Sequence, residues 1–493
     1  MPMTAVSSWL VDMTYQEIVD KIEKMRRFGR ATGYQVSREM LDRLSHPEEG
    51  QRVIHIAGTN GKGSTAAILA YILAAQGFRV GLFSSPHLLR FNERIRILET
   101  KENRRGAFDA ATAPRVITRQ ICDDAVRRLG EEILELPMEL PPTMFDICFC
   151  MGLCYFREEV CDFVILETGL GGKYDSTRAS SVVPLISIIT SIGLDHTAIL
   201  GNRPEEIAEN KAGILRPGTR CILGPMEEAA SRVIIRRCRQ EGIPFWQVTK
   251  SRAKDIFLAR GLEREDLALE GHYQIYNGAC AILAAEILHE MGVTCQKGRK
   301  TDRARGSATT APDSVREENQ AFCRALRSGL AQVSWPGRME RVNYRGRQIL
   351  IDGAHNPQGV DALAKSLRGF YPDTTCVFII GILADKEYDL MLEEILPLAA
   401  EVVTVTVDSD RALQAERLAA LIRGRGGCAH RAGSVSEALE LAADICKRRE
   451  GQGIRSPLVL FGSLYFVGQV KAFLADSPEE FRPEEAQERK SDI

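Results

Sequence analysis

The chain lacks long hydrophobic runs and has almost no excess of charge of either sign. No apolar stretch approaches the ~18 residues of a membrane span, and no basic region followed by a long apolar run opens the N-terminus, so we expect no signal peptide. The formal net charge of −2 over 493 residues gives no electrostatic reason to expect a nucleic-acid partner. We therefore expect a soluble, cytoplasmic protein that binds neither nucleic acid nor membrane.

Cysteine pairs with the spacing of a metal site are also missing from the densest cysteine group. The 13 cysteines are odd in number and irregularly spaced. Cys148, Cys150, Cys154 and Cys161 include no CxxC pair and lie among apolar residues. We interpret them as small core residues on a buried helix, and free thiols in this number fit a reducing cytosol.

What is present is an alternation of short apolar strands and helices. Hydrophobic residues make up 44% of the chain, and its length suggests about three domains or two large ones. A capping box at Thr14–Glu17 predicts a first amphipathic helix. A further helix is predicted over residues 64–76. Strands are predicted at 53–57, 78–83, 163–167, 185–190, 348–351, 376–380, 402–407 and 458–461. This order predicts an α/β fold with mostly parallel sheets and helices on both faces.

A glycine-rich segment follows the first of these strands and opens a helix. Its residues are Gly58, Thr59, Asn60, Gly61, Lys62, Gly63, Ser64 and Thr65. Glycines let consecutive N–H groups face phosphate oxygens, and the helix N-terminus favours anions. Lys62 can reach the β- and γ-phosphates, and the hydroxyl of Ser64 or Thr65 can reach Mg²⁺. Gly63 separates the lysine from the hydroxyls, unlike the common G-x-x-x-x-G-K-[ST] form. The alternative is a glycine-rich turn without a ligand.

Three further residues are candidates for the same rim of the sheet. Glu167 ends a strand and offers the hard oxygen that Mg²⁺ prefers, although it could be a solvated strand-end acid. His196 lies in another strand-end loop, where a structural histidine and a metal ligand are equally compatible with the pattern. Loops at the carboxyl ends of parallel strands converge on one cleft. The local pattern alone would make Lys211 an exposed helix lysine.

The pattern of elements is interrupted once, and this interruption divides the chain. Between Gln296 and Gln320 the sequence is polar and charged without apolar periodicity. We predict a P-loop ATPase domain over residues 1–295, a linker or disordered insertion over 296–322, and a smaller Rossmann-like α/β domain over 323–493.

Eight motifs in order resemble those of folylpolyglutamate synthases and dihydrofolate synthases, members of the Mur ligase superfamily. The resemblance extends from about residue 15 to residue 468. The motifs are Gly58–Thr65, Ser84-Ser-Pro-His-Leu88 with Phe91-Asn-Glu-Arg-Ile95, Glu167-Thr-Gly-Leu-Gly-Gly172, Asp195-His196, Lys211-Ala-Gly213, Trp335-Pro-Gly-Arg338, Asp352-Gly-Ala-His-Asn356 and Gly462-Ser-Leu-Tyr465.

The resemblance implies roles for individual positions. It implies that Gly58–Thr65 binds ATP, and that Lys62, Glu167, His196 and Lys211 form the catalytic set. Two Mg²⁺ ions would be held by Ser64, Ser85, Glu167 and His196. Lys211 would be carbamylated by CO₂ to support the second metal, and K⁺ is a further candidate cofactor. Nucleotide contacts across the domain cleft would come from Asn277, Arg338 and Asp352. The folate or glutamate would lie near Asp175, His355 and Ser463, with Arg30 a weaker candidate. A monomer is the expected state.

The sequence departs from the family pattern at three places. Arg178 stands where Asp-Ala-Thr-Asn motifs end in asparagine, so a contact made by that asparagine is in doubt. The pair Tyr273-Gln274 replaces His-Gln, and Phe145-Asp146 replaces Phe-Glu. None of these changes removes a predicted phosphate or metal residue.

The resemblance implies an ATP-dependent ligase that joins L-glutamate to tetrahydrofolate, and also to 7,8-dihydropteroate, through an acyl phosphate. One alternative is another amino-acid ligase of the superfamily, acting on peptidoglycan precursors. That enzyme would need a sugar-nucleotide domain before the ATPase, and only about 50 residues precede the phosphate loop, at the lower limit of domain size. Another is a P-loop NTPase switch that hydrolyses nucleotide without ligation. A third is a purely structural homologue, against which the intact Lys62, Glu167, His196 and Lys211 argue.

Overall fold

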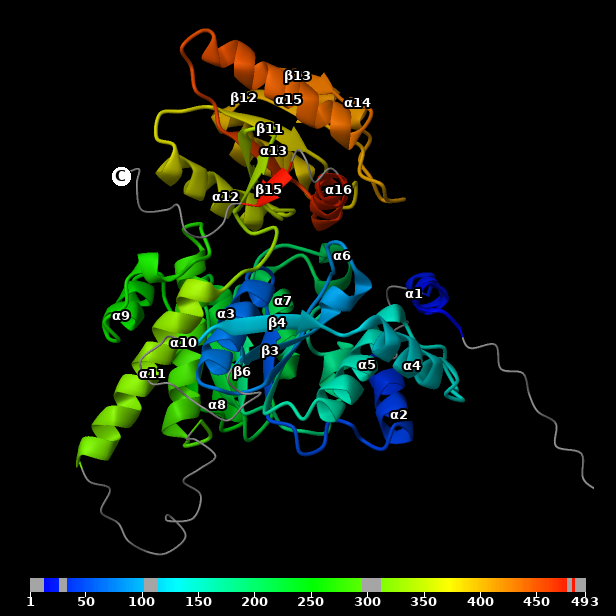
Figure 1. The fold of residues 1–493 in the computed structure, drawn as a ribbon, viewed down its shortest axis with the longest axis vertical. Coiled ribbons are helices and arrows are strands. Elements are labelled where there is room, and N and C mark those ends of the chain that lie inside the picture. The colour runs from blue at the N-terminus through cyan, green and yellow to red at the C-terminus, as the bar shows by residue number, and fades with distance from the viewer. Residues whose placement is uncertain (1–12, 26–32, 102–113, 295–311, 477–480, 484–493) are drawn as a thin grey trace, which may run out of the picture.

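Two α/β domains, each built on its own sheet, lie one above the other (Figure 1). The computed structural model describes residues 13–25, 33–101, 114–294, 312–476 and 481–483. The first sheet comes from the first half of the chain and the second sheet from residues after 339. The predicted α/β class with two sheets of mostly parallel strands is confirmed.

The first sheet has eight strands in the order β4-β3-β2-β5-β1-β6-β7-β8. The six strands from β2 to β8 in this order run parallel to one another, whereas β3 pairs antiparallel with both β2 and β4. The strands are β1 Val53–Ala57, β2 Val80–Phe83, β3 Ile95–Thr100, β4 Val116–Gln120, β5 Phe163–Glu167, β6 Ile186–Ile189, β7 Arg220–Leu223 and β8 Phe245–Gln247. Residues of β1 and β5 are all buried, as expected for central strands covered on both faces.

Helices cover both faces of this sheet. On one face the helices α3, α10 and α11 pack together, and on the other α1, α2, α4 and α5 do so. The helices are α1 Tyr15–Glu23, α2 Gln35–Arg43, α3 Lys62–Ala75, α4 Asp123–Leu134, α5 Met144–Glu158, α6 Thr197–Leu200, α7 Pro204–Lys211, α8 Glu228–Gln240, α9 Arg252–Leu258, α10 Gln274–Glu290 and α11 Pro312–Gln332. Within the described ranges, none of the helices combines the length and apolarity needed to cross a membrane.

Two local predictions about this domain are confirmed. Thr14 caps α1 as a capping box, with its N–H donating to Glu17 Oε2 at 2.7 Å. Cys148, Cys150 and Cys154 lie on α5 and are buried, and the burial raises the pKa of their thiols. These three cysteines are core residues, whereas the prediction is wrong for Cys161, which follows the end of α5 and is only half-buried.

The second sheet has seven strands in the order β13-β12-β11-β14-β10-β9-β15. Strands β13 to β10 are parallel, and β9 pairs antiparallel with β10 and β15. The strands are β9 Glu340–Tyr344, β10 Arg347–Ile351, β11 Cys376–Ile380, β12 Ala399–Thr404, β13 Ala429–Arg431, β14 Leu458–Phe461 and β15 Phe481–Pro483. Helices on both faces are α12 Pro357–Phe370, α13 Tyr388–Ile395, α14 Ala415–Gly424, α15 Val435–Glu450 and α16 Leu464–Ala475.

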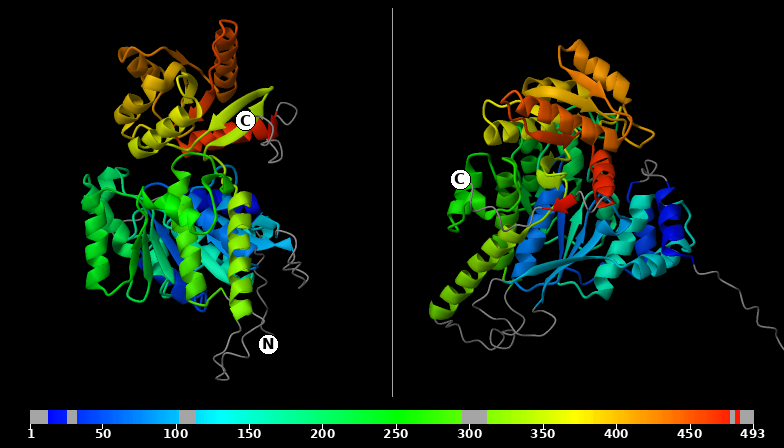
Figure 2. Two further views of the ribbon diagram at one scale, coloured as in Figure 1. Left: turned by 90° about the vertical axis from the view of Figure 1, so that its left-hand side faces the viewer. Right: turned by 45° about the horizontal axis from the view of Figure 1, so that its top comes forward.

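The expected linker over residues 296–322 is wrong for its last part. Residues 312–322 form the first half of α11, a helix of 21 residues that packs against α3 of the first domain. Its apolar side begins only at Phe322 and continues through Leu326 and Leu330. Residues 316–321 before it are mostly exposed, and α11 extends beyond the sheet at its N-terminal end (Figure 2). This half therefore carries no apolar periodicity. The rest of the expected linker, 296–311, lies outside the described residues.

Candidate functional site at the domain interface

The phosphate loop joins β1 to α3 through two glycines with positive φ angles. Gly61 has a φ of 84° and occupies the N-cap of α3, where no side chain of the described residues makes a capping hydrogen bond. A Cβ atom at Gly61 would lie 2.3 Å from Asn277 Oδ1, and one at Gly58 would lie 1.9 Å from Thr190 Oγ1. Both positions therefore require glycine, and the first N–H groups of α3 remain available for an anion.

The loop is held in shape by the segment that follows β6. Thr59 donates its N–H to the Ser191 carbonyl at 2.8 Å, and Asn60 donates its N–H to Ser191 Oγ at 3.0 Å. The Thr190 hydroxyl donates to the Asn60 carbonyl at 2.7 Å. Since β6 is the neighbour of β1, these bonds connect two strand ends into one rigid rim.

Two lysines converge on one carbonyl of the loop. Lys62 Nζ lies 3.1 Å and Lys211 Nζ lies 2.8 Å from the Gly58 oxygen. Lys211 is the last residue of α7 and is buried, contrary to the exposed position that the local pattern predicts. Burial, with a smaller contribution from the Lys62 charge, lowers the pKa of Lys211 to about 7. A substantial fraction of the amine is thus in its neutral, nucleophilic form near neutral pH.

Glu167 and Ser85 lie side by side at the ends of β5 and β2. The Ser85 N–H points to Glu167 Oε2 at 3.4 Å. Burial raises the pKa of Glu167, and the charge of Lys62 partly offsets this effect. A carboxylate that is buried without a directly bonded cation is held at a cost in stability. Such an arrangement suits a site where a metal ion would supply the counter-charge.

His196 and its neighbour Asp195 occupy the loop after β6, facing the second domain. His196 has a φ of 51°, and its pKa is lowered to about 4 by burial, against the opposing effect of Asp195. Asp195 Oδ1 lies 2.6 Å from Lys386 Nζ of the second domain. Burial would raise the pKa of Asp195, but the hydrogen bond and charge of His355, with the charge of Lys386, hold it well below its usual range.

A second set of contacts between the domains consists of side-chain amides. Asn60 of the phosphate loop donates to Asn356 Oδ1 at 3.1 Å and to Gln358 Oε1 at 2.8 Å. Asn356 donates in turn to Asp195 Oδ2 at 3.0 Å. The phosphate loop and the loop after β10 are thereby in direct hydrogen-bond contact.

The residues expected to approach the nucleotide lie where the two domains join. Asn277 donates to Gln274 Oε1 at 2.8 Å on the first turn of α10. Asp352 is buried, and its Oδ2 accepts from the Tyr273 hydroxyl and from the Met339 N–H, both at 2.9 Å. Arg338 donates to the carbonyl of its neighbour Gly337 at 2.9 Å. In this structure Asp352 therefore connects the end of β10 to α10.

The residues expected on the substrate side are more dispersed. His355 Nε2 lies 3.5 Å from Asp195 Oδ2, so His355 belongs to the interface just described. Asp175 accepts from the Leu170 N–H at 2.8 Å and caps the short helix that follows it. Ser463 caps α16 by accepting from the Tyr465 N–H at 3.2 Å. Arg30 lies outside the described residues.

Several members of this interface carried too little local signal to be singled out by sequence reasoning. Asp195 was visible only as the neighbour of His196. Lys386 follows β11 in a polar loop, in the same strand-end position as the predicted residues of the first domain. Strand-end position could have suggested Lys386, but nothing in the sequence pairs it with Asp195. At Arg178, the departure from the family pattern, Nε donates to the Gly213 carbonyl at 3.0 Å.

Comparison with known proteins matches this arrangement to one enzyme family. Residues 337–454 match the family described as Mur ligase, glutamate ligase domain. The dihydrofolate synthase/folylpolyglutamate synthase of Bacillus subtilis is 32% identical over 476 residues, covering 93% of this chain and 98% of that protein. The folylpolyglutamate synthase of Lacticaseibacillus casei is 30% identical, covering 94% and 99%.

Solved structures show the same fold over nearly the whole chain. Mycobacterium tuberculosis folylpolyglutamate synthase complexed with ADP superposes with a TM-score of 0.73 at 23% identity, covering 93% of this chain and 98% of that one. An FPGS–AMPPCP–folate complex superposes with a TM-score of 0.69 at 26% identity, covering 94% and 100%. The chain belongs to the folylpolyglutamate synthase/dihydrofolate synthase family of Mur ligases.

Proposed function

We propose that this protein is an ATP-dependent carboxylate–amine ligase that adds L-glutamate to a folate. The observation that carries the proposal is the direct contact of the phosphate loop with the loop after β10, made by Asn60 with Asn356 and Gln358. It brings a phosphate-binding helix N-terminus against a glutamate ligase domain. The names of the relatives and their coverage of the chain support the folate as substrate.

The reaction first requires activation of a carboxylate, which is a poor acylating group at neutral pH. Transfer of the γ-phosphoryl group of ATP to the carboxylate makes an acyl phosphate. The glutamate amine then attacks, and phosphate leaves as the amide forms. In this scheme the N–H groups of α3 and the Lys62 ammonium hold the phosphates and offset their charge. No covalent enzyme nucleophile is needed.

The residues present fit the expected metal ions. Ser85 and Glu167 are adjacent at the strand ends, and His196 has a lowered pKa that keeps its imidazole neutral and able to bind a metal. We propose that these residues, with Ser64, would hold two Mg²⁺ ions, which would supply charge neutralisation at the phosphates. We also propose that the protein binds K⁺ and that it functions as a monomer.

Lys211 fits the expected carbamate. A carbamate forms when a neutral amine attacks CO₂ and loses a proton, so a lysine with its pKa lowered to about 7 is suited to the reaction. We propose that the modified side chain would exchange its ammonium charge for a negative one beside Lys62. That exchange would remove the repulsion between the two lysine charges at Gly58 and leave an oxygen ligand at the metal site.

The substrate side is proposed at the interface of the two domains. His355 and the loops of Asp175 and Ser463 would border the folate or the glutamate, with Arg30 a further candidate. The buried pair of Asp195 and Lys386 forms when the domains are together. Domain closure of this kind excludes water that would hydrolyse an acyl phosphate.

A paired-substrate assay tests the proposal. The protein is supplied with ATP, Mg²⁺ and labelled glutamate, with either 7,8-dihydropteroate or tetrahydrofolate as acceptor. We expect label in the product of at least one acceptor and equimolar ADP. If neither acceptor gains glutamate, the folate assignment fails. The two arms also separate a folylpolyglutamate synthase from an enzyme with both activities.

The same assay separates ligation from a nucleotide switch. A P-loop switch would release ADP at a rate that does not depend on either acceptor or glutamate. A ligase releases ADP only when both co-substrates are present. An amino-acid ligase for another acceptor would bind ATP but leave both folates unchanged.

A further inference from the structure

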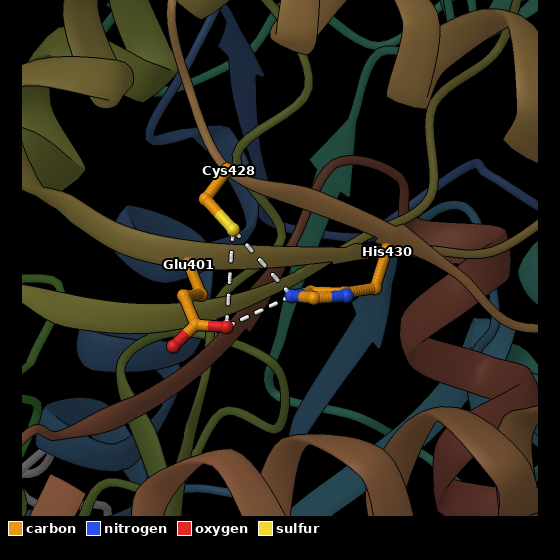
Figure 3. Close-up of side chains that lie close together, drawn as sticks. All are labelled: Glu401, Cys428 and His430. Carbon is orange, nitrogen blue, oxygen red and sulfur yellow. Dashed lines mark hydrogen bonds and ion pairs between the residues drawn. The ribbon is translucent and has the colours of Figure 1, made fainter.

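A cluster of three side chains with metal-binding chemistry lies on the second sheet, outside the site described above. Glu401 lies on β12, Cys428 directly precedes β13, and His430 lies on β13 (Figure 3). The His430 Nε2 atom is 2.8 Å from Glu401 Oε2 and 3.6 Å from Cys428 Sγ, and the sulfur is 3.9 Å from the same carboxylate oxygen. All three polar atoms point toward one another.

The strand pairing explains why these residues meet. Strands β12 and β13 are parallel, with Val403 opposite His430 and Val402 opposite Ala429. Side chains two apart on a strand share a face, so Cys428 and His430 project on the side of the sheet where Glu401 also projects. Because β13 is the last strand of the sheet, the cluster lies at an edge that ions can reach from solvent.

We propose that Glu401, Cys428 and His430 form a zinc-binding site. Zinc–ligand lengths of about 2.0–2.3 Å in a tetrahedron place donor atoms roughly 3.4 Å apart for N and O, and about 3.6 Å apart for pairs with sulfur. The distances of 3.6 and 3.9 Å that involve the sulfur lie within about 0.3 Å of these values, whereas the 2.8 Å between His430 Nε2 and Glu401 Oε2 is a hydrogen-bond distance, about 0.6 Å shorter, that would lengthen around an ion. Thiolate, imidazole and carboxylate together suit Zn²⁺ better than Mg²⁺ or Ca²⁺. Since Cys428 is exposed, a water molecule would take the fourth position.

The surroundings of the cluster favour this ligand set. Arg448 on α15 pairs with the other oxygen of Glu401, which orients the carboxylate and leaves Oε2 directed at the cluster. Outer hydrogen-bond partners of this kind position metal ligands in many proteins. On binding, the Cys428 thiol loses its proton to solvent. The His430 Nε2–H that faces Glu401 loses its proton to solvent, while Nδ1 takes up a proton from solvent, so the Nε2 lone pair becomes free for the metal.

The proposed site lies away from the ATP cleft. Glu401 and Cys428 lie near the amino ends of their strands, whereas the Lys386 loop follows the carboxyl end of β11. Zinc here would connect the edge strand β13 to β12 and, through Arg448, to α15. The expected effect is on the stability of the second domain, not on a step of ligation.

Cobalt(II) substitution in the full chain tests the site under reducing conditions. We expect a thiolate-to-cobalt charge-transfer band at one Co²⁺ per chain, which excess Zn²⁺ abolishes. The residues proposed to hold Mg²⁺ in the ATP cleft include no sulfur, so cobalt there cannot produce this band. Cys122→Ser serves as the matched control because Cys122 is also an exposed free thiol, and it should keep the band.

Variants of the cluster complete the test. Cys428→Ser should lose the band, and His430→Asn should weaken Co²⁺ binding by more than the roughly 10–100-fold lost with an outer-shell partner. Zn²⁺ should raise the unfolding temperature of the unmodified chain and of the Cys122 variant, but not of the Cys428 variant. A charge-transfer band that persists in Cys428→Ser, or an unmodified chain that shows none in excess Co²⁺, would overturn the proposal. Circular dichroism establishes that each variant is folded.

Discussion

Replacement of Gly61 in the phosphate loop by alanine should lower the free energy of unfolding for two reasons. The first is backbone strain, since a residue with a side chain at a φ of 84° loses roughly 1 kcal/mol. The second is a clash, because the new Cβ atom would lie 2.3 Å from Asn277 Oδ1. Asn277 is buried and donates to Gln274, so moving it away costs a hydrogen bond of about 1 kcal/mol. Gly61→Ala should therefore lower the free energy of unfolding by about 2 kcal/mol.

A second glycine isolates the strain from the clash. Gly50 has a φ of 78°, and nothing lies within 4 Å of the position its Cβ atom would take. Gly50→Ala should cost only the backbone strain, about 1 kcal/mol. In the double variant Gly61→Ala/Asn277→Ala, the added cost of the clash should disappear, since the obstructing amide is gone.

Urea unfolding of the four proteins, followed by fluorescence and circular dichroism, measures these differences. Binding of a fluorescent ATP analogue reports the functional effect. A shift of the first turn of α3 costs the nucleotide its best N–H contacts, so Gly61→Ala should bind about tenfold more weakly, equal to about 1.4 kcal/mol. Gly50→Ala should bind normally. Equal stability losses in the two single variants, with no relief from removing the Asn277 amide, would refute this account of the loop.

Three further predictions concern charged residues of the interface. Lys386→Met removes the cation that lies 2.6 Å from Asp195, so ligation should fall at least about tenfold while binding of the ATP analogue is kept. The control Lys365→Met, which removes an exposed ion pair, should have no effect. Unchanged turnover in Lys386→Met would contradict this prediction. Because burial lowers the pKa of Lys211 to about 7, the neutral amine fraction rises with pH through 7. A carbamate signal from ¹³C-bicarbonate should therefore grow between about pH 6 and 8 and be absent in Lys211→Arg; a signal independent of pH would be incompatible with this origin. Burial raises the pKa of Glu167, so its ionised form destabilises the folded state above the ordinary carboxyl pKa. At pH 7, Glu167→Gln should then unfold at a urea concentration equal to or higher than that of the unmodified protein, and it should lose ligation. The difference in stability should disappear as acid protonates Glu167 in the unmodified protein. A strongly destabilised variant would show that Glu167 has a structural partner.

The elements of the fold were accessible to sequence reasoning to different degrees. Strands such as Phe163–Glu167 and Leu458–Phe461 were predicted with their observed bounds, because a continuous apolar run bounded by turns is typical of a buried parallel strand. The strand β4 was missed, since its half-exposed pattern resembles a polar connection. The strand β3 was missed although it is almost entirely buried, because Arg96 and Glu99 interrupt its apolar run. The first half of α11 was also missed, because a helix that extends beyond the domain has no apolar face there.

The sequence by itself determined the phosphate loop and the family. Glycine spacing, a following helix and a lysine are local properties, and a run of eight motifs in order needs no coordinates. The tertiary structure decided how distant residues combine. It buried Lys211 beside Lys62, brought Lys386 to Asp195 across two domains, and assembled Glu401 with Cys428 and His430 on adjacent strands. The reason is physical: strand order and domain contact set these distances, and the cost of burial sets the resulting pKa values. Neither is encoded in the spacing of residues along the chain.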